Sequence, residues 1–425
     1  MSTIILIGSF FVLLFLNVPI AGCLGLSSLL TLGFMGMNFT TIPINYYAAS
    51  HKFVLLAIPF FILAGNIMEK AGISGKLIDL AKSMVGHMKG GLALVCVIVS
   101  CFFAAISGSG PATVAALGMI VIPAMINVGY RPASASALMA TSGAIGVIIP
   151  PSISFVVYGS ITGTSISKMF MGGILPGLLM GICLVVAMFF ASRKDKLVTL
   201  PRASRAEKWK AFKVAIWGLL MPVIILGGIY GGIFTPTEAA AVAAVYGLFV
   251  GVFVYKTIGL KELYKIFVDS ASQTAVVMFI VCAASLFSYV ITVGGIASSA
   301  GAALTNISSG NRVIFLFIVN IILLIAGCFI DGTSAFYIFT PIMFPVAMAL
   351  GIDPVAFGVM MTMNLAIGQV TPPVGVNLYV AAPMGGVNIG QIAKAVVPFV
   401  LASLVALLLI TYIPGIVTLL PSLLK

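Results

Sequence analysis

A chain of 425 residues that is 61% hydrophobic and only 7% charged is not a water-soluble globular protein, because soluble domains carry about 25% charged residues. Apolar runs of about twenty residues recur along it, and each is long enough to cross a hydrocarbon core roughly 30 Å thick. The net charge of +12 favours basic cytoplasmic loops over nucleic-acid binding, because such loops retain Lys and Arg. The composition therefore predicts an all-α polytopic membrane protein.

The sequence argues against three other kinds of function: a metal or redox centre, the use of ATP as an energy source, and a membrane-embedded enzyme. The six cysteines lie scattered in apolar segments without metal-ligand spacing, so we expect neither disulfides nor a redox or metal centre from them. No G-x-x-x-x-G-K-[ST] loop is present, so the sequence does not imply ATP as an energy source. A single acid in the predicted core, Asp331, argues against a membrane-embedded enzyme.

The first half of the chain predicts a re-entrant hairpin and a broken helix. After three apolar segments, Glu69 to Lys89 is polar enough for an amphipathic helix along the membrane surface. Two short apolar arms then meet at Ser107-Gly-Ser-Gly-Pro-Ala-Thr113, which predicts a hairpin at about 90–127 with its tip inside the membrane. The next helix, about 132–162, contains Pro150 and Pro151, which break it because proline removes a backbone donor and clashes with the preceding turn.

The same pattern returns 222 residues later. Pro372 and Pro373 match the first proline pair, Gly332 matches Gly110 and Gly368 matches Gly146. A second hairpin is expected at about 313–350, with Asp331-Gly-Thr-Ser334 at its tip, and a second broken helix at about 355–383. We therefore predict a first repeat at 1–192, a basic cytoplasmic linker at 193–213 and a second repeat at 214–425.

Charge indicates that the two copies are inserted upside down relative to each other. The polar stretch of the first copy carries four lysines, whereas its counterpart at 293–312 carries only Arg312. Because Lys and Arg are retained on the cytoplasmic side, the two stretches face opposite sides. The predicted fold class is thus two inverted-topology repeats, each with a re-entrant hairpin and a discontinuous helix.

Inverted repeats with paired broken helices are typical of secondary transporters. Half-helix C-termini and unwound carbonyls offer partial negative charge to a cation, and an oxygen-only ligand set suits a hard cation such as Na⁺. We expect two or more Na⁺ sites. The residues expected to hold Na⁺ are Ser107, Gly110, Gly146 and Ile149 at the first site, and Asp331, Gly332, Thr333, Gly368 and Thr371 at the second.

Two interpretations of Asp331 stay open, and they can coexist. Its charge is expensive within a membrane, which favours Na⁺ ligation, proton coupling or positioning of the tip. Alternatively, it caps the helix that follows. Polar groups around the tips and breaks also predict a substrate cavity, although each alone could equally bond its own backbone. The residues expected to face the substrate are Ser109, Ser152, Ser154, Ser334 and Asn377.

Four motifs spread along the chain carry a family resemblance. They are Ser107-Gly-Ser-Gly-Pro-Ala-Thr113, Gly146-Val-Ile-Ile-Pro-Pro-Ser152, Phe234-Thr-Pro-Thr-Glu-Ala-Ala240 and Gly368-Gln-Val-Thr-Pro-Pro-Val-Gly375. Together they resemble the large membrane subunit of tripartite ATP-independent periplasmic (TRAP) transporters, the DctM-like family. Within that family the sequence looks closest to sialic acid members.

The resemblance implies an elevator-type, Na⁺-driven symporter in a bacterial inner membrane. It implies import of a carboxylate, with sialic acid favoured and a C4-dicarboxylate or keto acid as other choices. It also implies two partners, a small four-helix membrane subunit and a periplasmic substrate-binding protein. The alternative is a stand-alone Na⁺/carboxylate symporter of similar hairpin architecture, which uptake by this chain alone would distinguish.

Overall fold

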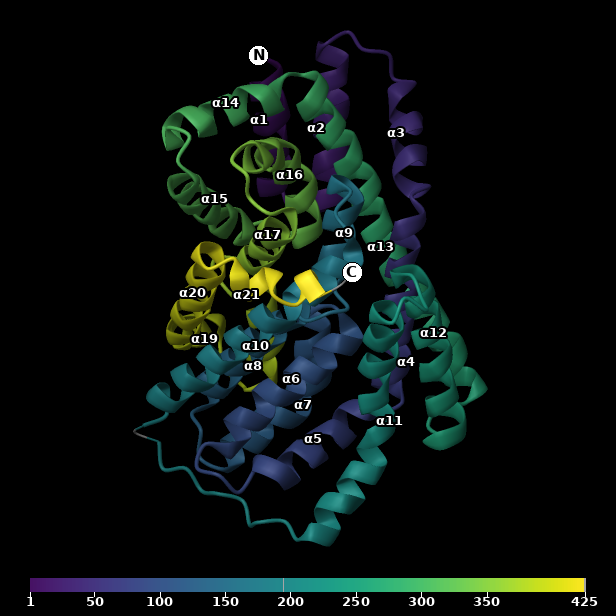
Figure 1. The fold of residues 1–425 in the computed structure, drawn as a ribbon, viewed down its shortest axis with the longest axis vertical. Helices are drawn as coiled ribbons and strands as arrows, with labels where there is room; N and C mark the ends of the chain where they lie inside the picture. The colour runs from purple at the N-terminus through teal and green to yellow at the C-terminus, as the bar shows by residue number, and fades with distance from the viewer. Residues whose placement is uncertain (194, 424–425) are drawn as a thin grey trace.

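The computed structural model describes residues 1–193 and 195–423, and over these residues the chain is helical with no β-strand (Figure 1). Residue 194, in the predicted linker, and residues 424 and 425, at the end of the predicted second repeat, lie outside the described residues. Among the described residues, seven helices are long and apolar enough to cross a membrane, and the bent pair α19 (Ile389–Ala395) and α20 (Val397–Tyr412) makes an eighth candidate. The predicted all-α polytopic fold is confirmed.

The first half of the chain contains the hairpin arms α6 and α7 and the broken helix formed by α8, η2 and α9. Its elements are α1 (Ser2–Phe15), α2 (Ile20–Phe34), α3 (Thr41–Ser50), η1 (Phe53–Leu56), α4 (Ala57–Lys70), α5 (Ile73–Val85), α6 (Gly91–Ser107), α7 (Gly110–Asn127), α8 (Pro132–Ala144), η2 (Ile145–Val147), α9 (Ile153–Thr162) and α10 (Ile166–Ala191).

The second half contains the hairpin arms α15 and α16 and the broken helix formed by α17 and α18. Its elements are α11 (Arg205–Tyr230), α12 (Pro236–Phe249), η3 (Val250–Val254), α13 (Leu260–Val293), α14 (Ile296–Ser308), α15 (Arg312–Gly327), α16 (Gly332–Ala349), α17 (Pro354–Gly368), α18 (Val376–Met384), α19, α20, α21 (Gly415–Thr418) and η4 (Pro421–Leu423).

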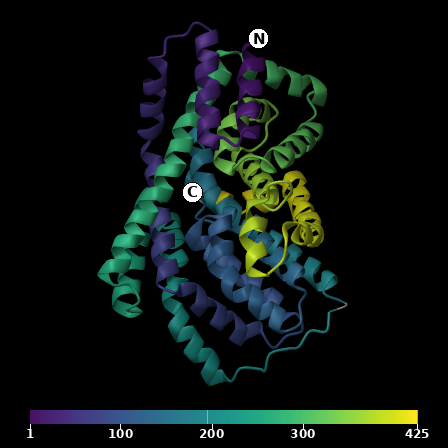
Figure 2. The ribbon, with the colours of Figure 1, turned by 180° about the vertical axis from the view of Figure 1, so that it is seen from behind.

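The two halves repeat each other in inverted orientation. The hairpin arms α7 and α16 begin at Gly110 and Gly332 and end at Asn127 and Ala349, so both ends keep the offset of 222 residues. The short helices that precede the hairpins, α5 and α14, lie at opposite ends of the molecule in both views (Figures 1 and 2). The limits of the two repeats at residues 192 and 214 stay predictions.

The connection between the halves is shorter than the predicted linker, 193–213. α11 begins within that range because Ser204 and Glu207 form a capping box. The Glu207 N–H donates to Ser204 Oγ at 3.2 Å, and the Ser204 N–H donates to Glu207 Oε2 at 2.7 Å. The end of the predicted linker is therefore the first part of a helix.

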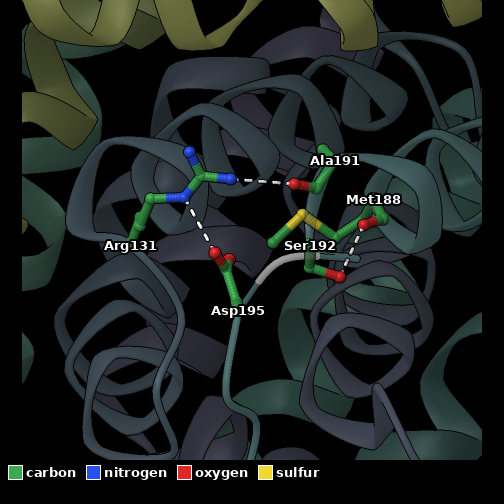
Figure 3. Close-up of polar contacts among 5 residues, drawn as sticks. All are labelled: Arg131, Met188, Ala191, Ser192 and Asp195. Atoms are coloured by element: carbon green, nitrogen blue, oxygen red, sulfur yellow. Dashed lines mark hydrogen bonds and ion pairs between the residues drawn. The ribbon is translucent and has the colours of Figure 1, made fainter.

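The start of this connection is fixed to the first copy. Arg131, in the turn between α7 and α8, places its Nε 2.9 Å from Asp195 Oδ1. The same guanidinium donates through Nη2 to the Ala191 carbonyl at 2.9 Å, so it also binds the end of α10 (Figure 3). Arg131 thus connects the chain beyond α10 to the base of the first hairpin.

The described helices pack as two groups that lie side by side (Figures 1 and 2). In the first, called the scaffold group, α13 packs on α2, α3 and α4, and α12 packs on α4. In the second, called the hairpin group, α7 and α18 pack on α8, α15 packs on α17, and α10 packs on α20. The groups meet where α4 contacts α6 and where α13 contacts α16, which brings the hairpins against the scaffold group.

Candidate functional site

The tip of the first hairpin packs closely on the helix break of its own copy. Gly108 has a φ of +59°, and a Cβ built on it would lie 3.0 Å from the Pro151 carbonyl oxygen. A Cβ on Gly146 would lie 2.8 Å from Thr113 Oγ1 and 3.1 Å from the Ser109 carbonyl oxygen. Because these contacts are tighter than a methyl group permits, glycine is required at both positions.

Hydroxyl and carbonyl oxygens gather at this tip. Ser107 Oγ lies 2.8 Å from Thr113 Oγ1, and the Thr113 hydroxyl also contacts the Ser109 carbonyl oxygen at 2.8 Å. The structure therefore brings Ser107 and Gly146 to one place, as expected for the first cation site. The Ile149 side chain packs against Gly177 of α10, and ligation through the Ile149 carbonyl stays a prediction.

At the second tip, Asp331 caps α16. Its Oδ1 accepts from the Ser334 N–H at 3.0 Å, and its Oδ2 accepts from the Ser334 hydroxyl at 2.5 Å. The capping interpretation of Asp331 is thus confirmed, while Na⁺ ligation stays a prediction. Thr333 follows in the first turn and is half-buried.

Behind this tip, the end of α15 touches the end of α17 through backbone alone. A Cβ on Gly368 would overlap the backbone of Gly327, so the two helices meet only because both positions lack a side chain. Thr371, after the break, donates to the Ile367 carbonyl at 2.8 Å. Gly332 faces the other copy, since its Cβ position lies 3.8 Å from Ser154 Oγ.

The first hairpin tip also touches the break of the second copy. The side chains of Gln369 and Asn377 crowd Gly110, whose Cβ position would lie 3.1 Å from Asn377 Nδ2 and 3.3 Å from Asn377 Oδ1. Asn377 Nδ2 donates to the Ala140 carbonyl of α8 at 3.0 Å. Gln369 Oε1 and Asn377 Oδ1 are buried and have no hydrogen-bond partner among the described residues, so two acceptor oxygens remain available beside Gly110.

A polar cavity of about 350 Å³ separates the first hairpin tip from the scaffold group. Ser107 and Ser109 line it from the tip, and Asn66, Glu69 and Gln273 line it from α4 and α13. The remaining lining residues are Ile62, Gly65, Phe103, Ala112, Ile153, Ser272, Val276 and Val277. The cavity therefore lies at the boundary between the two groups of helices.

Of the residues expected to face the substrate, Ser109 lines this cavity and the others do not. Ser152 is fully buried and donates to the Val147 carbonyl at 2.5 Å. Ser334 and Asn377 are also fully buried, and Ser154 is half-buried beside the second tip. The Ser152 and Ser334 hydroxyls complete local hydrogen bonds at the break and the cap, which is the alternative that the sequence leaves open, whereas Asn377 bonds the Ala140 carbonyl of the other copy.

Sequence reasoning missed the scaffold side of the cavity. Asn66 and Glu69 lie three positions apart on α4, and this spacing places them on one helix face. The sequence alone contains this spacing. Asn66 Nδ2 donates to Ser270 Oγ at 2.8 Å and contacts Gln273 Oε1 at 3.5 Å. No local pattern connects α4 with residues about 200 positions later on α13, so this half of the site depends on the tertiary fold.

Within residues 1–193 and 195–423, no three His, Cys, Asp or Glu side chains form a group that could hold a metal ion. A cation at the tips would therefore depend on carbonyl, hydroxyl and amide oxygens, with the Asp331 carboxylate at the second tip, and such oxygen ligands suit a hard cation. This arrangement of hairpin tips, helix breaks and a polar cavity between two helix groups defines a membrane transporter.

The chain belongs to the family described as "Tripartite ATP-independent periplasmic transporter, DctM component", whose model matches residues 7–416. It is a TRAP transporter large permease and not an enzyme. The C4-dicarboxylate TRAP transporter large permease protein DctM of Pseudomonas aeruginosa is 45% identical over 94% of this chain and 93% of that protein.

Other relatives carry different substrate names. The isethionate TRAP transporter permease protein DctMQ of Oleidesulfovibrio alaskensis is 43% identical over 97% of this chain and 65% of its own length. The sialic acid TRAP transporter large permease protein SiaM of Vibrio cholerae is 38% identical over 97% of this chain and 96% of that protein. The solved structure of the Alcanivorax borkumensis YdaH transporter matches with a TM-score of 0.64 and 16% identity, covering 89% of this chain and 88% of that chain, which supports the fold alone.

Proposed function

We propose that this permease is the Na⁺-coupled symport subunit of a TRAP system that imports an organic acid anion across a bacterial inner membrane. The observation that carries the proposal is the meeting of both hairpin tips with both helix breaks, where the first tip lines a polar cavity. The ions would bind at the tips and the substrate would bind in the adjoining cavity. Na⁺ binding at a tip would then stabilise the conformation that receives the substrate.

The oxygen chemistry of the tips supports Na⁺. At the first site, the Ser109 carbonyl and the Ser107 and Thr113 hydroxyls lie together against Gly146. At the second site, Asp331 adds a carboxylate at the hairpin tip. These are hard oxygen donors without nitrogen or sulfur, as expected for an alkali cation.

The two helix groups support an elevator mechanism. Both tips and both breaks belong to the hairpin group, and the polar cavity lies between that group and α4 and α13 of the scaffold group. A movement of the hairpin group along the scaffold group would carry the tips, ions and substrate together. Alternating access by relative movement of two bodies is the general mechanism of such transporters.

The proposed substrate is a small organic acid, and the choice within that class needs measurement. The sequence favours sialic acid, whereas the relative named for C4-dicarboxylates is 45% identical and the relative named for sialic acid is 38% identical. The proposed partners are a small four-helix membrane subunit and a periplasmic substrate-binding protein. The words "tripartite" and "periplasmic" in the family description support both partners.

Uptake into proteoliposomes tests this function. The permease is reconstituted with its small subunit, and labelled sialic acid and a labelled C4-dicarboxylate are supplied with and without the binding protein. We expect uptake of one of them only when an inward Na⁺ gradient and the binding protein are both present. Uptake by the permease alone would instead support the stand-alone symporter.

A further inference from the structure

An apolar groove runs along α6 and α10 from one membrane edge to the first helix break. It has a volume of about 450 Å³, and Pro222 and Leu226 of α11 form its third side. On α6 the lining residues fall on one helix face, and an equivalent face of α10 extends from Ile174 to Val186. The lining residues of α6 are Leu94, Val97, Ile98, Cys101, Phe102 and Ala105.

At one end of the groove lies a smaller cavity of about 140 Å³, which is mostly apolar and has three polar side chains in its lining. Leu94 and Val185 line both spaces, so the two are adjacent. Lys89, Tyr130 and Ser192 contribute polar groups to the smaller cavity. The combined space is therefore apolar along most of its length and polar at its outer end.

The polar end contains one buried hydroxyl that lacks a hydrogen-bond partner among the described residues. Tyr130 is only 3% exposed, and its hydroxyl has no hydrogen-bond partner among the described residues. That hydroxyl lies 3.8 Å from the Cβ position of Gly90, the N-cap of α6, which provides no side-chain cap. In the first turn of this helix, the Gly91 and Ala93 N–H groups already donate to the Met88 and Gly90 carbonyls at 2.8 and 3.0 Å. A phosphate would therefore accept from the Tyr130 hydroxyl.

Charges around this end favour an anion. Lys89 lines the cavity and is exposed. Asp195 is the acid close by, but Arg131 neutralises it at 2.9 Å (Figure 3). Ser192, which also lines the cavity, donates to the Met188 carbonyl at 2.8 Å (Figure 3). The ammonium of Lys89 thus remains to attract a phosphate.

We propose that this groove binds one phospholipid from the leaflet on the basic side of the membrane. The phosphate binds Tyr130 Oη and Lys89, and one acyl chain follows the apolar faces of α6 and α10 towards Ile149 and Pro150. From Leu94 to Ala105 the groove rises about 17 Å at 1.5 Å per residue, close to the half-thickness of about 15 Å of a hydrocarbon core. The lipid would fill the space between the hairpin group and α11.

Tyr130→Phe separates lipid binding from folding. An unpartnered buried hydroxyl costs stability, so its removal leaves the lipid-free protein at least as stable as wild type. In native mass spectrometry of the purified permease, we expect wild type to retain one phosphatidylglycerol and Tyr130→Phe to lose most of that occupancy. Phosphatidylglycerol should also raise the thermal midpoint of wild type more than that of the variant.

Further variants test each part of the groove. Lys89→Gln should weaken retention at the polar end, and Ile182→Trp should block the acyl chain, because Ile182 lines the groove and is 62% exposed. The matched controls are Lys265→Gln, on an exposed Lys of α13, and Val245→Trp, on an exposed position of α12. Equal lipid retention by wild type and all three groove variants would overturn the proposal. Equal protection by inorganic phosphate alone would also overturn it, because the site would then be an anion site without an acyl chain.

Discussion

Asn377 Nδ2 donates to the carbonyl oxygen of Ala140 at 3.0 Å, and this hydrogen bond joins the break of the second copy to a helix of the first. Both residues are fully buried, and the same Asn377 side chain crowds Gly110 at the first hairpin tip. The two copies therefore share one packed centre instead of forming two independent sites. Any movement of one tip relative to this centre must break or carry this contact.

Asn377→Ala should weaken this centre without unfolding the protein. The variant loses one interhelical hydrogen bond, worth about 0.6 to 1.5 kcal/mol, and leaves a small cavity. We expect a small fall in thermal midpoint in detergent and a large fall in uptake, because the first tip loses its support from the second copy. Wild-type uptake by a normally expressed Asn377→Ala would contradict this role.

Gly368→Ala should separate α15 from α17. Its Cβ would overlap the backbone of Gly327, which cannot turn aside as a side chain can. Overpacking of this kind costs about 1–3 kcal/mol, and we expect a lower thermal midpoint together with loss of uptake. Gly227→Ala in α11 is the matched control, since nothing lies within 4 Å of its Cβ position. A Gly368→Ala protein as stable as Gly227→Ala would refute the contact.

Asp331 variants distinguish helix capping from ion binding. Asn caps a helix about as well as Asp, so Asp331→Asn should keep the thermal stability that Asp331→Ala loses. If the carboxylate also binds Na⁺, Asp331→Asn raises the Na⁺ concentration for half-maximal uptake by about tenfold, equivalent to about 1.4 kcal/mol. The check is a Na⁺ titration of uptake. An unchanged titration would leave Asp331 with the capping role alone.

Gln273→Ala should weaken substrate binding from the scaffold side of the polar cavity. Gln273 lines the cavity and contacts Asn66, and it is the residue through which α13 presents an amide to the space. Loss of one hydrogen bond of about 1 kcal/mol should raise the KM for the substrate about fivefold while kcat changes little. Thr274→Ala, the next residue on α13 but outside the cavity lining, is the control. Equal KM values for the two variants would place the substrate elsewhere.

Much of the fold could be predicted because the same sequence pattern occurs twice, so the interpretation of one copy supports that of the other. Pro150 and Pro151 disrupt a helix through local backbone chemistry, and their recurrence as Pro372 and Pro373 identifies the second copy. The structure breaks both helices at these prolines. Charge density did not indicate the Ser204 and Glu207 capping box that starts α11 within the predicted linker, and the limits of that linker stay predictions.

The candidate site was harder to predict than the fold. The sequence predicts Gly110 and Gly146 as cation-site residues, and the structure places both at the tip and break contacts, while ion binding there stays a prediction. The sequence pattern does not predict where the Ser152 and Ser334 hydroxyls point, because a short hydroxyl beside a break can bond either its own backbone or a ligand. The contribution of α4 and α13 to the cavity depends on packing between distant segments, which no local spacing encodes.

The most direct test of the central claim is a Na⁺ titration of substrate uptake in proteoliposomes, for wild type and for Gly146→Ala, each with the small subunit and the binding protein. A Cβ at Gly146 would lie 2.8 Å from Thr113 Oγ1 and 3.1 Å from the Ser109 carbonyl oxygen, and would therefore displace two of the proposed ligands of the first ion. The account predicts cooperative Na⁺ dependence in wild type and a half-saturation concentration about tenfold higher in Gly146→Ala. Uptake that proceeds without Na⁺, or identical titrations for the two proteins, would contradict it.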